Sequence, residues 1–366
     1  MMNRRHFILL AGAILVACLS GFPISGGIQV AAEAIPAHLS DREFEKLMDE
    51  FSEPDGSFRS DNLLSNEAGL QRVIPELVRT AKHGRVYMGV GPEQNFTYIT
   101  ALRPKMAFIV DVRRLNRDLH LMYKAVFELS ADRAEFVSRL FSIQRPEGLT
   151  GKSTASEIFE AYSSVEKNEE LYRQNLKAIR DQLLTKRKLA LIAADLEGIE
   201  YVYHAFFWYG PTIQYSSTGS FGGRSQPTYY DLMVANDGTN DGKGEQRSYL
   251  SSEENFAFLK GLETKNMLVP IVGNFAGPKA IRSVGKYLVD KGAVVSAFYL
   301  SNVEQYLMQE GRWSDFCHNV SVLPLDDTST FIRAVRGGRN GAGFGFGLSS
   351  EVGPMLNDVK NCGDGR

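Results

Sequence analysis

Two glycines and one aspartate, Gly89, Gly91 and Asp111, have the types and spacing of a nucleotide-binding unit. The apolar run 85–90 predicts a buried strand, and the glycines then open a turn into a helix for which Pro92 suits the first position. Glycine lets the backbone approach a ligand, and an acid about twenty residues further on receives ribose hydroxyls. The spacing therefore predicts a nucleotide-type ligand, and the alternative is a strand-to-helix turn that needs glycine only for its backbone angles.

The third glycine of the dinucleotide fingerprint is missing, because Asn95 and Phe96 stand where close helix packing would need it. NAD is therefore disfavoured. Asn95 and Arg113 complete the set of residues that we expect to bind the ligand. Arg113 is grouped with Arg114 and Arg117, which indicates either contact with an anionic ligand or an ordinary solvated helix start.

The elements that must position these residues alternate between apolar runs and helical patterns. This alternation predicts an α/β fold, Rossmann-like, with a mainly parallel sheet, helices on both faces, a helical N-terminal extension and a helical insertion at about 144–198. A capping box at Ser40 and Glu43 begins the first helix. The expected strands are 85–90, 106–110, 199–208, 266–273, 293–300, 317–323 and 330–335.

In such a sheet, ligands lie beyond the carboxyl ends of the strands, near the point where the strand order reverses. Side chains at or after the later strands form the expected cleft set: His204, Asn274, Tyr299, Asn302, Glu304 and Asp326. Ser301 and Asn302 equally suit turn or cap positions, and His204 equally suits a core position. The sequence identifies no catalytic residue.

Several kinds of site are not expected. The net charge of −2 does not indicate a basic surface that would bind nucleic acid. The six histidines have no paired spacing and there is no Cys-x-x-Cys, so no metal site is expected. Neither a nucleophile elbow nor a phosphate loop that ends in Gly-Lys-Ser/Thr is present.

The first seventeen residues predict a signal peptide, because a basic start is followed by the apolar run 7–17. Eleven apolar residues are too few to span a bilayer. Leu15-Val16-Ala17-Cys18 resembles a bacterial lipobox, which implies that acylated Cys18 anchors the exported protein to the membrane of the cell envelope. Residues 4–8 resemble the twin-arginine export motif. The alternative is a signal peptide cut further on, for instance after Ala32-Glu33-Ala34, which would make the protein periplasmic.

After the signal peptide we expect a tether at 18–38, a Rossmann-like domain at 39–336 and a Gly-rich tail at 337–366. Cys317 and Cys362 remain in the mature chain. An oxidising envelope would permit a disulfide between them. The alternative is that Cys317 is a buried small residue and Cys362 lies on a loose tail.

Five blocks of the sequence carry a resemblance to a known family: GVGPEQNFTYITALRPKMAFIVDVRR, ELSADRAEFVSRLFS, VGNFAGPKAIRSVG, AFYLSNVEQYL and LPLDDTSTFIRAVR. Together they resemble a bacterial family with a Rossmann, S-adenosylmethionine-dependent methyltransferase-like domain. The resemblance covers most of residues 60–336. It implies that Gly89 and Gly91 face the methionine end of S-adenosyl-L-methionine and that Asp111 faces its ribose. Methyltransferases usually carry an acid shortly before the first glycine, where Tyr87 and Met88 stand here.

Two functions follow from the resemblance and the signal peptide. One is methyl transfer from S-adenosyl-L-methionine to a small or envelope-associated acceptor. The other is a non-catalytic, membrane-tethered module that binds a small-molecule ligand or a protein partner in the same cleft. Export favours the module, since little S-adenosyl-L-methionine is present outside the cytoplasm. A dehydrogenase is the least favoured alternative.

Overall fold

The computed structural model describes residues 34–217, 226–238, 244–336, 348–360 and 362. The predicted signal peptide, Cys18 and most of the tether lie outside these residues, as do residues 337–347 of the predicted tail. Among the described residues, no helix has both the length and the apolar character needed to cross a bilayer.

Within the described part of the chain, six strands form one sheet in the order β3-β2-β1-β4-β5-β6. The strands are β1 (Val86–Gly89), β2 (Met106–Asp111), β3 (Leu268–Val272), β4 (Val295–Ser301), β5 (Thr330–Arg336) and β6 (Leu348–Pro354). Strands β1 to β5 are parallel, and β6 runs antiparallel to β5. The predicted α/β fold with a mainly parallel sheet is confirmed. The strand order reverses between β1 and β4, which is where doubly wound sheets bind their ligands.

The central strands are buried on both faces, so their sequences are continuous apolar runs without alternation. Pro270 lies in β3, at one edge of the sheet, where a residue without an N–H group does not interrupt a ladder on its outer side.

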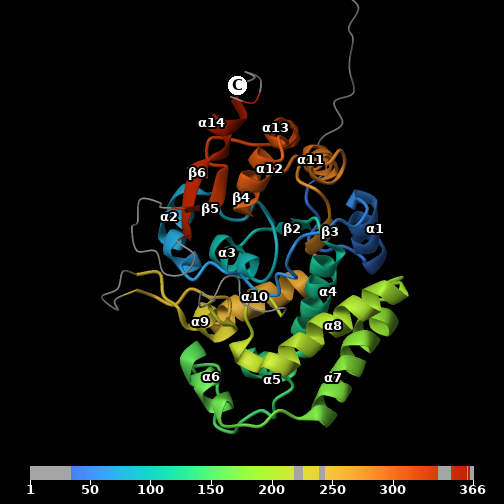
Figure 1. Ribbon diagram of the computed structural model, residues 1–366, viewed down its shortest axis with the longest axis vertical. Coiled ribbons are helices and arrows are strands. Elements are labelled where there is room, and N and C mark those ends of the chain that lie inside the picture. The colour runs from blue at the N-terminus through green and yellow to red at the C-terminus, as the bar shows by residue number, and fades with distance from the viewer. Residues whose placement is uncertain (1–33, 218–225, 239–243, 337–347, 361, 363–366) are drawn as a thin grey trace, which may run out of the picture. The chain divides into compact units, whose positions relative to one another are not determined.

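Helices cover both faces of the sheet (Figure 1). The helices before and directly after β1 and β2 are α1 (Asp41–Phe51), η1 (Leu70–Val73), α2 (Ile74–Thr80), α3 (Gln94–Leu102), α4 (Arg114–Leu129) and α5 (Arg133–Phe141). Those between α5 and β3 are α6 (Ala155–Ser163), α7 (Glu169–Asp181), η2 (Gln182–Lys186), α8 (Ala193–Tyr209), η3 (Gly210–Thr212), α9 (Tyr229–Val234) and α10 (Glu253–Thr264). The last are α11 (Ala280–Asp290), α12 (Val303–Gln309), α13 (Trp313–Ser321) and α14 (Met355–Lys360).

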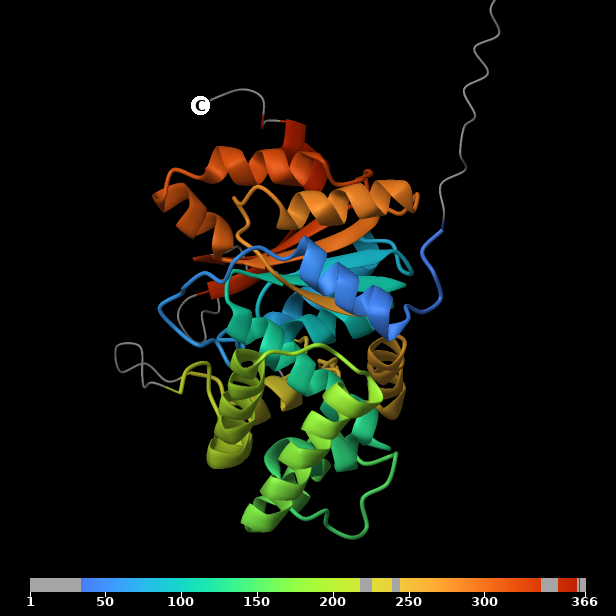
Figure 2. The same ribbon diagram turned by 90° about the vertical axis from the view of Figure 1, so that its right-hand side faces the viewer.

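Packing divides these helices into layers. Helix α4 packs on β2 and β3, and α10 packs on α3 and α4. Helix α1 packs on β3 and on α11, which in turn contacts β2 and α13. Figure 2 shows α5 to α8 as a further helical layer, in green and yellow, beyond the helices that touch the sheet.

Helix α1 begins where its capping box predicts. The Ser40 hydroxyl accepts a hydrogen bond from Glu43 N at 3.2 Å, and the Glu43 carboxylate accepts one from Ser40 N at 2.8 Å. Each bond satisfies a polar group that the start of a helix leaves without an internal partner.

Two predicted strands are wrong. Residues 199–208 belong to α8, and their buried members Ile199, Val202, Tyr203 and Phe206 have helical spacing. Residues 317–323 begin inside α13. Both segments are rich in residues that favour strands, but packing against neighbouring helices overrides that preference.

The helical excursion and the tail also differ from expectation. Among the described residues between β2 and β3 there is no strand of the sheet, so the excursion runs from α4 to α10 and is longer than 144–198. Residues 348–360, expected in the Gly-rich tail, form β6 and α14 and complete the sheet. Cys317 and Cys362 are joined in a disulfide that ties α13 to the end of the chain.

Candidate functional site

A cleft of about 270 Å³ lies at the carboxyl ends of β1 to β4, where the strand order reverses. The residues that line it from the sheet are Val90, Gly91, Pro92, Gln94, Asp111, Val112, Arg113, Asn274, Phe275, Tyr299, Ser301 and Asn302. Its other walls come from the segment 57–66, from α12, and from Tyr215 and Gln226 of the helical excursion. Of the expected residues, Gly91, Asp111, Arg113, Asn274, Tyr299 and Asn302 therefore share one cleft.

The turn after β1 faces the Asp111 carboxylate. Gly91 has a φ of +75°, in the left-handed region that favours glycine. A Cβ atom at Gly91 would lie 4.0 Å from Asp111 Oδ2. The glycine turn and the acid thus border the same space.

Gly89 and Asn95 pack against each other within this turn, and neither residue lines the cleft. A Cβ atom at Gly89 would overlap with Asn95 Oδ1. The Asn95 amide donates to the carbonyl oxygens of Val90 at 2.9 Å and Pro92 at 2.7 Å, and its Oδ1 accepts from the Tyr87 hydroxyl at 2.8 Å. Gly89 is therefore needed for the packing of Asn95.

Asp111 and Arg113 form a buried, two-pronged ion pair. Arg113 Nε lies 2.9 Å from Asp111 Oδ1, and Arg113 Nη2 lies 2.8 Å from Oδ2. The backbone N–H of Arg113 also donates to Oδ1 at 3.0 Å. Oδ1 thus accepts two hydrogen bonds and Oδ2 one, which leaves Oδ2 with one site for a ligand hydroxyl on the side that faces Gly91.

Arg113 also binds the backbone of the segment 57–66. Its Nη1 donates to the backbone oxygen of Ser60 at 3.3 Å and to that of Asp61. The guanidinium therefore holds the segment 57–66 over the cleft. The neighbouring cations are also paired, because Arg114 and Arg117 both contact the carboxylate of Asp195.

His120, which the sequence did not indicate as a site residue, forms a hydrogen bond with the backbone of the glycine turn. Its Nε2 lies 2.9 Å from the Gly91 carbonyl oxygen. Burial lowers the pKa of His120 to about 4. The ring is therefore neutral at pH 7, and Nε2 carries the proton that it donates to the carbonyl.

Glu67 is a buried acid beneath the cleft, and it forms hydrogen bonds with side chains that line the cleft. Glu67 Oε1 accepts from the Tyr299 hydroxyl at 2.6 Å and from the Ser301 hydroxyl at 2.7 Å. Glu67 Oε2 accepts from Gln94 Nε2 at 3.0 Å and from the Ser350 hydroxyl at 3.1 Å. This one side chain connects α3, β4 and β6, and no local sequence pattern predicts it.

A second buried acid, Glu93, follows Pro92 in the turn. Its Oε1 accepts from Ser65 N at 3.3 Å, and its Oε2 has no partner. Burial raises the pKa of Glu93 to about 8. The group is therefore mostly protonated at pH 7.

Three of the expected residues lie away from the cleft. His204 sits on α8, exposed and stacked on Trp208. Glu304 is held by Arg333, whose Nη2 lies 2.9 Å from Glu304 Oε1. Asp326 precedes β5 at the amino ends of the parallel strands, where its carboxylate lies 2.7 Å from Arg85 Nη1. Because 199–208 lie in α8 and 317–321 lie in α13, His204 and Asp326 do not follow strands.

The lining of the cleft mixes polar and apolar side chains and is balanced in charge. Its charged side chains are two cations and two anions: Arg59, Arg113, Asp111 and Glu310. Six carboxamides also line it: Asn62, Asn66, Gln94, Gln226, Asn274 and Asn302. Such a lining suits a polar ligand without large net charge. Within the described ranges, no three His, Cys, Asp or Glu side chains gather as a metal site.

Residues 63–198 and 227–349 match the family model described as "Domain of unknown function (DUF7790)". The chain belongs to this family. The match covers the strand ends that build the cleft, whereas Tyr215 and Gln226 fall between its two parts. No curated protein matches the chain.

Proposed function

We propose that this DUF7790 protein binds S-adenosyl-L-methionine in the cleft and transfers its methyl group to an acceptor. The observation that carries the proposal is the convergence of the Gly91 turn, Asp111 and the ends of β3 and β4 on one cleft where the strand order reverses. The open acceptor site on Asp111 Oδ2 suits a ribose hydroxyl, and the turn at Gly91 has no side chain to obstruct a ligand.

The same turn disfavours ligands with a pyrophosphate. Phosphates bind to backbone N–H groups at the start of the first helix, but Pro92 has no N–H group and the Asn95 amide fills the turn. The described lining contains no lysine. Of its two arginines, Arg113 is already paired with Asp111, and Arg59 donates to the Tyr306 hydroxyl at 2.8 Å. These features favour a nucleoside without phosphate, such as S-adenosyl-L-methionine.

When bound, S-adenosyl-L-methionine supplies a methyl group on a positively charged sulfur. The residues of the chain would bind and orient the ligand: Asp111 through the ribose, and Tyr299 and Asn302 from the far side of the switch point. Methyl transfer depends mainly on alignment of the donor, the methyl group and the acceptor.

Isothermal titration of the protein with S-adenosyl-L-methionine and S-adenosylhomocysteine tests the proposal. We expect binding by the wild type, and binding about 10- to 100-fold weaker for Asp111→Asn, which removes a charged acceptor. The matched control is Asp326→Asn, which lies at the amino ends of the strands, away from the cleft. This variant should bind both ligands as the wild type does. Absence of heat with both ligands would remove the methyltransferase proposal.

One observation favours a binding module without turnover. Of the acids that line the cleft, Asp111 is paired with Arg113 and Glu310 is exposed. Among the described residues of the cleft, an acceptor that must lose a proton therefore meets no positioned base. Binding of S-adenosylhomocysteine, together with no methyl transfer from S-adenosyl-L-methionine to an envelope extract, would favour the module.

Export and lipid anchoring through Cys18 form part of the proposal. The disulfide between Cys317 and Cys362 supports it, because such bonds persist in oxidising compartments. Mass spectrometry of the mature N-terminus tests the anchor: an acylated Cys18 is expected, and a free N-terminus downstream of it would contradict the anchor.

A further inference from the structure

Gln226 is the one buried amide of the cleft with both polar atoms unused. Only 6% of the residue is exposed, it lines the cleft, and neither Oε1 nor Nε2 has a hydrogen-bond partner among the described residues. Its backbone is held separately, because its carbonyl oxygen accepts from Gln214 Nε2 at 3.2 Å. The backbone of Gln226 is therefore anchored at the wall of the cleft, and the two polar atoms of its amide are closed off from solvent.

A buried amide without partners is unfavourable. Most buried polar side-chain atoms are hydrogen-bonded, and an unpaired one loses its bonds to water without compensation. An apolar side chain of the same size would avoid this loss. Because Gln226 lines the cleft, rotation of its side chain exposes the amide to a bound ligand, which is its natural partner.

A second amide supports this interpretation. Asn62 lines the same cleft, and its Oδ1 is buried without a partner. Its backbone has a φ of +46°, an uncommon conformation for a residue other than glycine that often occurs at functional sites. The segment of Asn62 and the segment of Gln226 thus both bring unused amide atoms to the cleft.

The chemistry of a carboxamide narrows the kind of ligand. It offers one acceptor and one donor side by side, and the matching group is a planar edge with a donor next to an acceptor. The amino group and N7 of adenine form such an edge, to which Gln and Asn bind with two hydrogen bonds.

We propose that Gln226 recognises the adenine of the ligand through two hydrogen bonds, and so selects 6-aminopurine nucleosides. This inference rests on the proposed function, in which Asp111 receives the ribose of the same ligand. Adenine selection then comes from the helical excursion, whereas ribose binding comes from the sheet.

The test is Gln226→Met, which keeps the length of the side chain and removes both polar atoms. The protein is titrated with S-adenosylhomocysteine and with S-inosylhomocysteine, in which an oxygen replaces the amino group. We expect the wild type to prefer the adenosyl compound about 10-fold or more, and Gln226→Met to bind it about 10- to 100-fold more weakly with no preference. The midpoint of unfolding without ligand should not fall, because the amide has no partner to lose.

The matched control is Gln246→Met. The Gln246 amide donates to Val234 O at 3.1 Å and to Ser156 Oγ at 3.3 Å, and it does not line the cleft. This variant should lose stability and keep both binding and the adenosyl preference. Gln226→Glu, which keeps an acceptor and loses the donor, serves the same test if the Met variant does not fold.

The outcomes separate the two proposals. If the wild type binds S-adenosylhomocysteine and the Gln226 variants bind it equally well, adenine recognition by Gln226 is overturned and the methyltransferase proposal stands. Equal binding of the adenosyl and inosyl compounds by the wild type also overturns it. If the wild type binds neither compound, both proposals fall.

Discussion

At the scale of single residues, the turn after β1 depends on groups that stay neutral. His120 donates to the Gly91 carbonyl, and Glu93 is buried two residues further on. Burial lowers the pKa of His120 to about 4 and raises that of Glu93 to about 8. Burial thus disfavours the charged forms of both His120 and Glu93 beside the cleft. A turn flanked by neutral side chains is compatible with a ligand that lacks phosphate.

The raised pKa of Glu93 predicts a dependence of stability on pH. Unfolding brings this pKa back to about 4.5, so between pH 4.5 and 8 the unfolded chain binds fewer protons than the folded protein. The contribution of Glu93 is fully present below pH 4.5 and is lost as the pH rises towards 8, at about 1.4 kcal/mol per pH unit.

Urea unfolding of the wild type and Glu93→Gln across this range measures the effect. Gln resembles the protonated acid, so the variant should lack this slope and become relatively more stable as the pH rises. His120 acts in the opposite direction below pH 6.5, because its folded pKa is depressed, but it is present in both proteins and cancels in the comparison. Parallel stability curves for the two proteins would show that Glu93 does not titrate as described.

At the scale of elements, the sequence predicts the central buried strands of the sheet, but it also predicts two strands that are helices and misses β6. Strands β1, β2 and β3 are buried runs bounded by turns, a pattern that few other structures produce. The run 199–208 has the same apolar density but lies in a helix of 17 residues, so its length and its i, i+3, i+4 spacing were the better guide. Strand β6 was missed because its sequence, LSSEVGP, contains two serines, a glutamate, a glycine and a proline and so lacks the apolar run of a buried strand.

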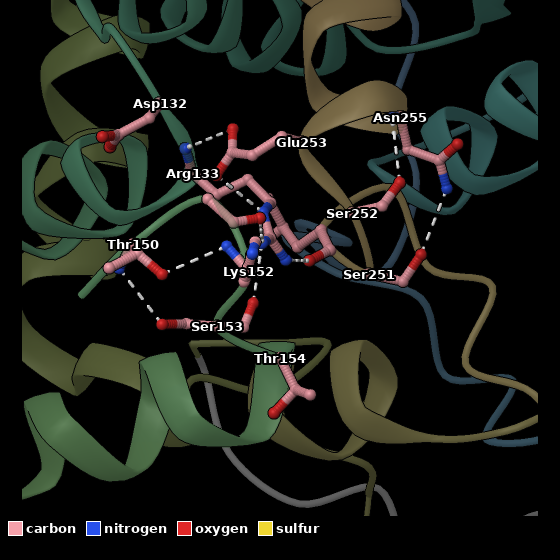
Figure 3. A network of polar contacts seen from close by, with 12 residues as sticks. Asp132, Arg133, Thr150, Lys152, Ser153, Thr154, Ser251, Ser252, Glu253 and Asn255 are labelled. Carbon is pink, nitrogen blue, oxygen red and sulfur yellow. Dashed lines mark hydrogen bonds and ion pairs between the residues drawn. The ribbon is translucent and has the colours of Figure 1, made fainter.

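One buried arginine joins the elements of the helical excursion (Figure 3). Arg133, at the start of α5, is 1% exposed and its Nε lies 2.9 Å from Glu253 Oε1. The same guanidinium donates to the carbonyl oxygens of Leu250 at 2.7 Å and Ser153 at 2.7 Å. It therefore ties α5 to the loops that precede α6 and α10.

We expect Arg133→Met to destabilise the protein by about 3–5 kcal/mol, because it leaves Glu253 and the carbonyl groups of Leu250, Gly151 and Ser153 without their donor. The control is Arg173→Ala on α7, whose ion pair with Glu170 has side chains 64% and 62% exposed, and which should cost no more than about 0.5 kcal/mol. Chemical denaturation followed by circular dichroism measures both. Equal effects of the two variants would contradict the role of Arg133.

At the scale of the whole molecule, the sequence predicts the sheet side of the cleft but not its cover. The residues at the ends of β1 to β4 follow from strand order and from the rule for parallel sheets. Tyr215, Gln226 and the segment 57–66 reach the cleft only through tertiary contacts, such as the bond from Leu63 N to Tyr215 O at 2.8 Å. No periodicity or motif in the sequence predicts contacts between segments that lie so far apart in the chain.

The disulfide between Cys317 and Cys362 closes a sequence separation of 45 residues that contains β5, β6 and α14. A cross-link over a loop of this length stabilises the folded state by about 3–4 kcal/mol, mainly by restricting the unfolded chain. Strand β6 also carries Ser350, which donates to Glu67 beneath the cleft. Loss of the cross-link should therefore loosen the edge of the sheet and the support of Tyr299 together.

We expect a reducing agent to lower the midpoint of thermal unfolding of the wild type and to leave a Cys317→Ala, Cys362→Ala variant unchanged. The oxidised protein should contain no titratable thiol from these two cysteines, and the variant should match the reduced wild type in stability. An oxidised wild type no more stable than the variant would show that the C-terminal elements are held by packing alone. Ion pairs such as that of Arg333 with Asp358 on α14 would then be the contacts to remove next.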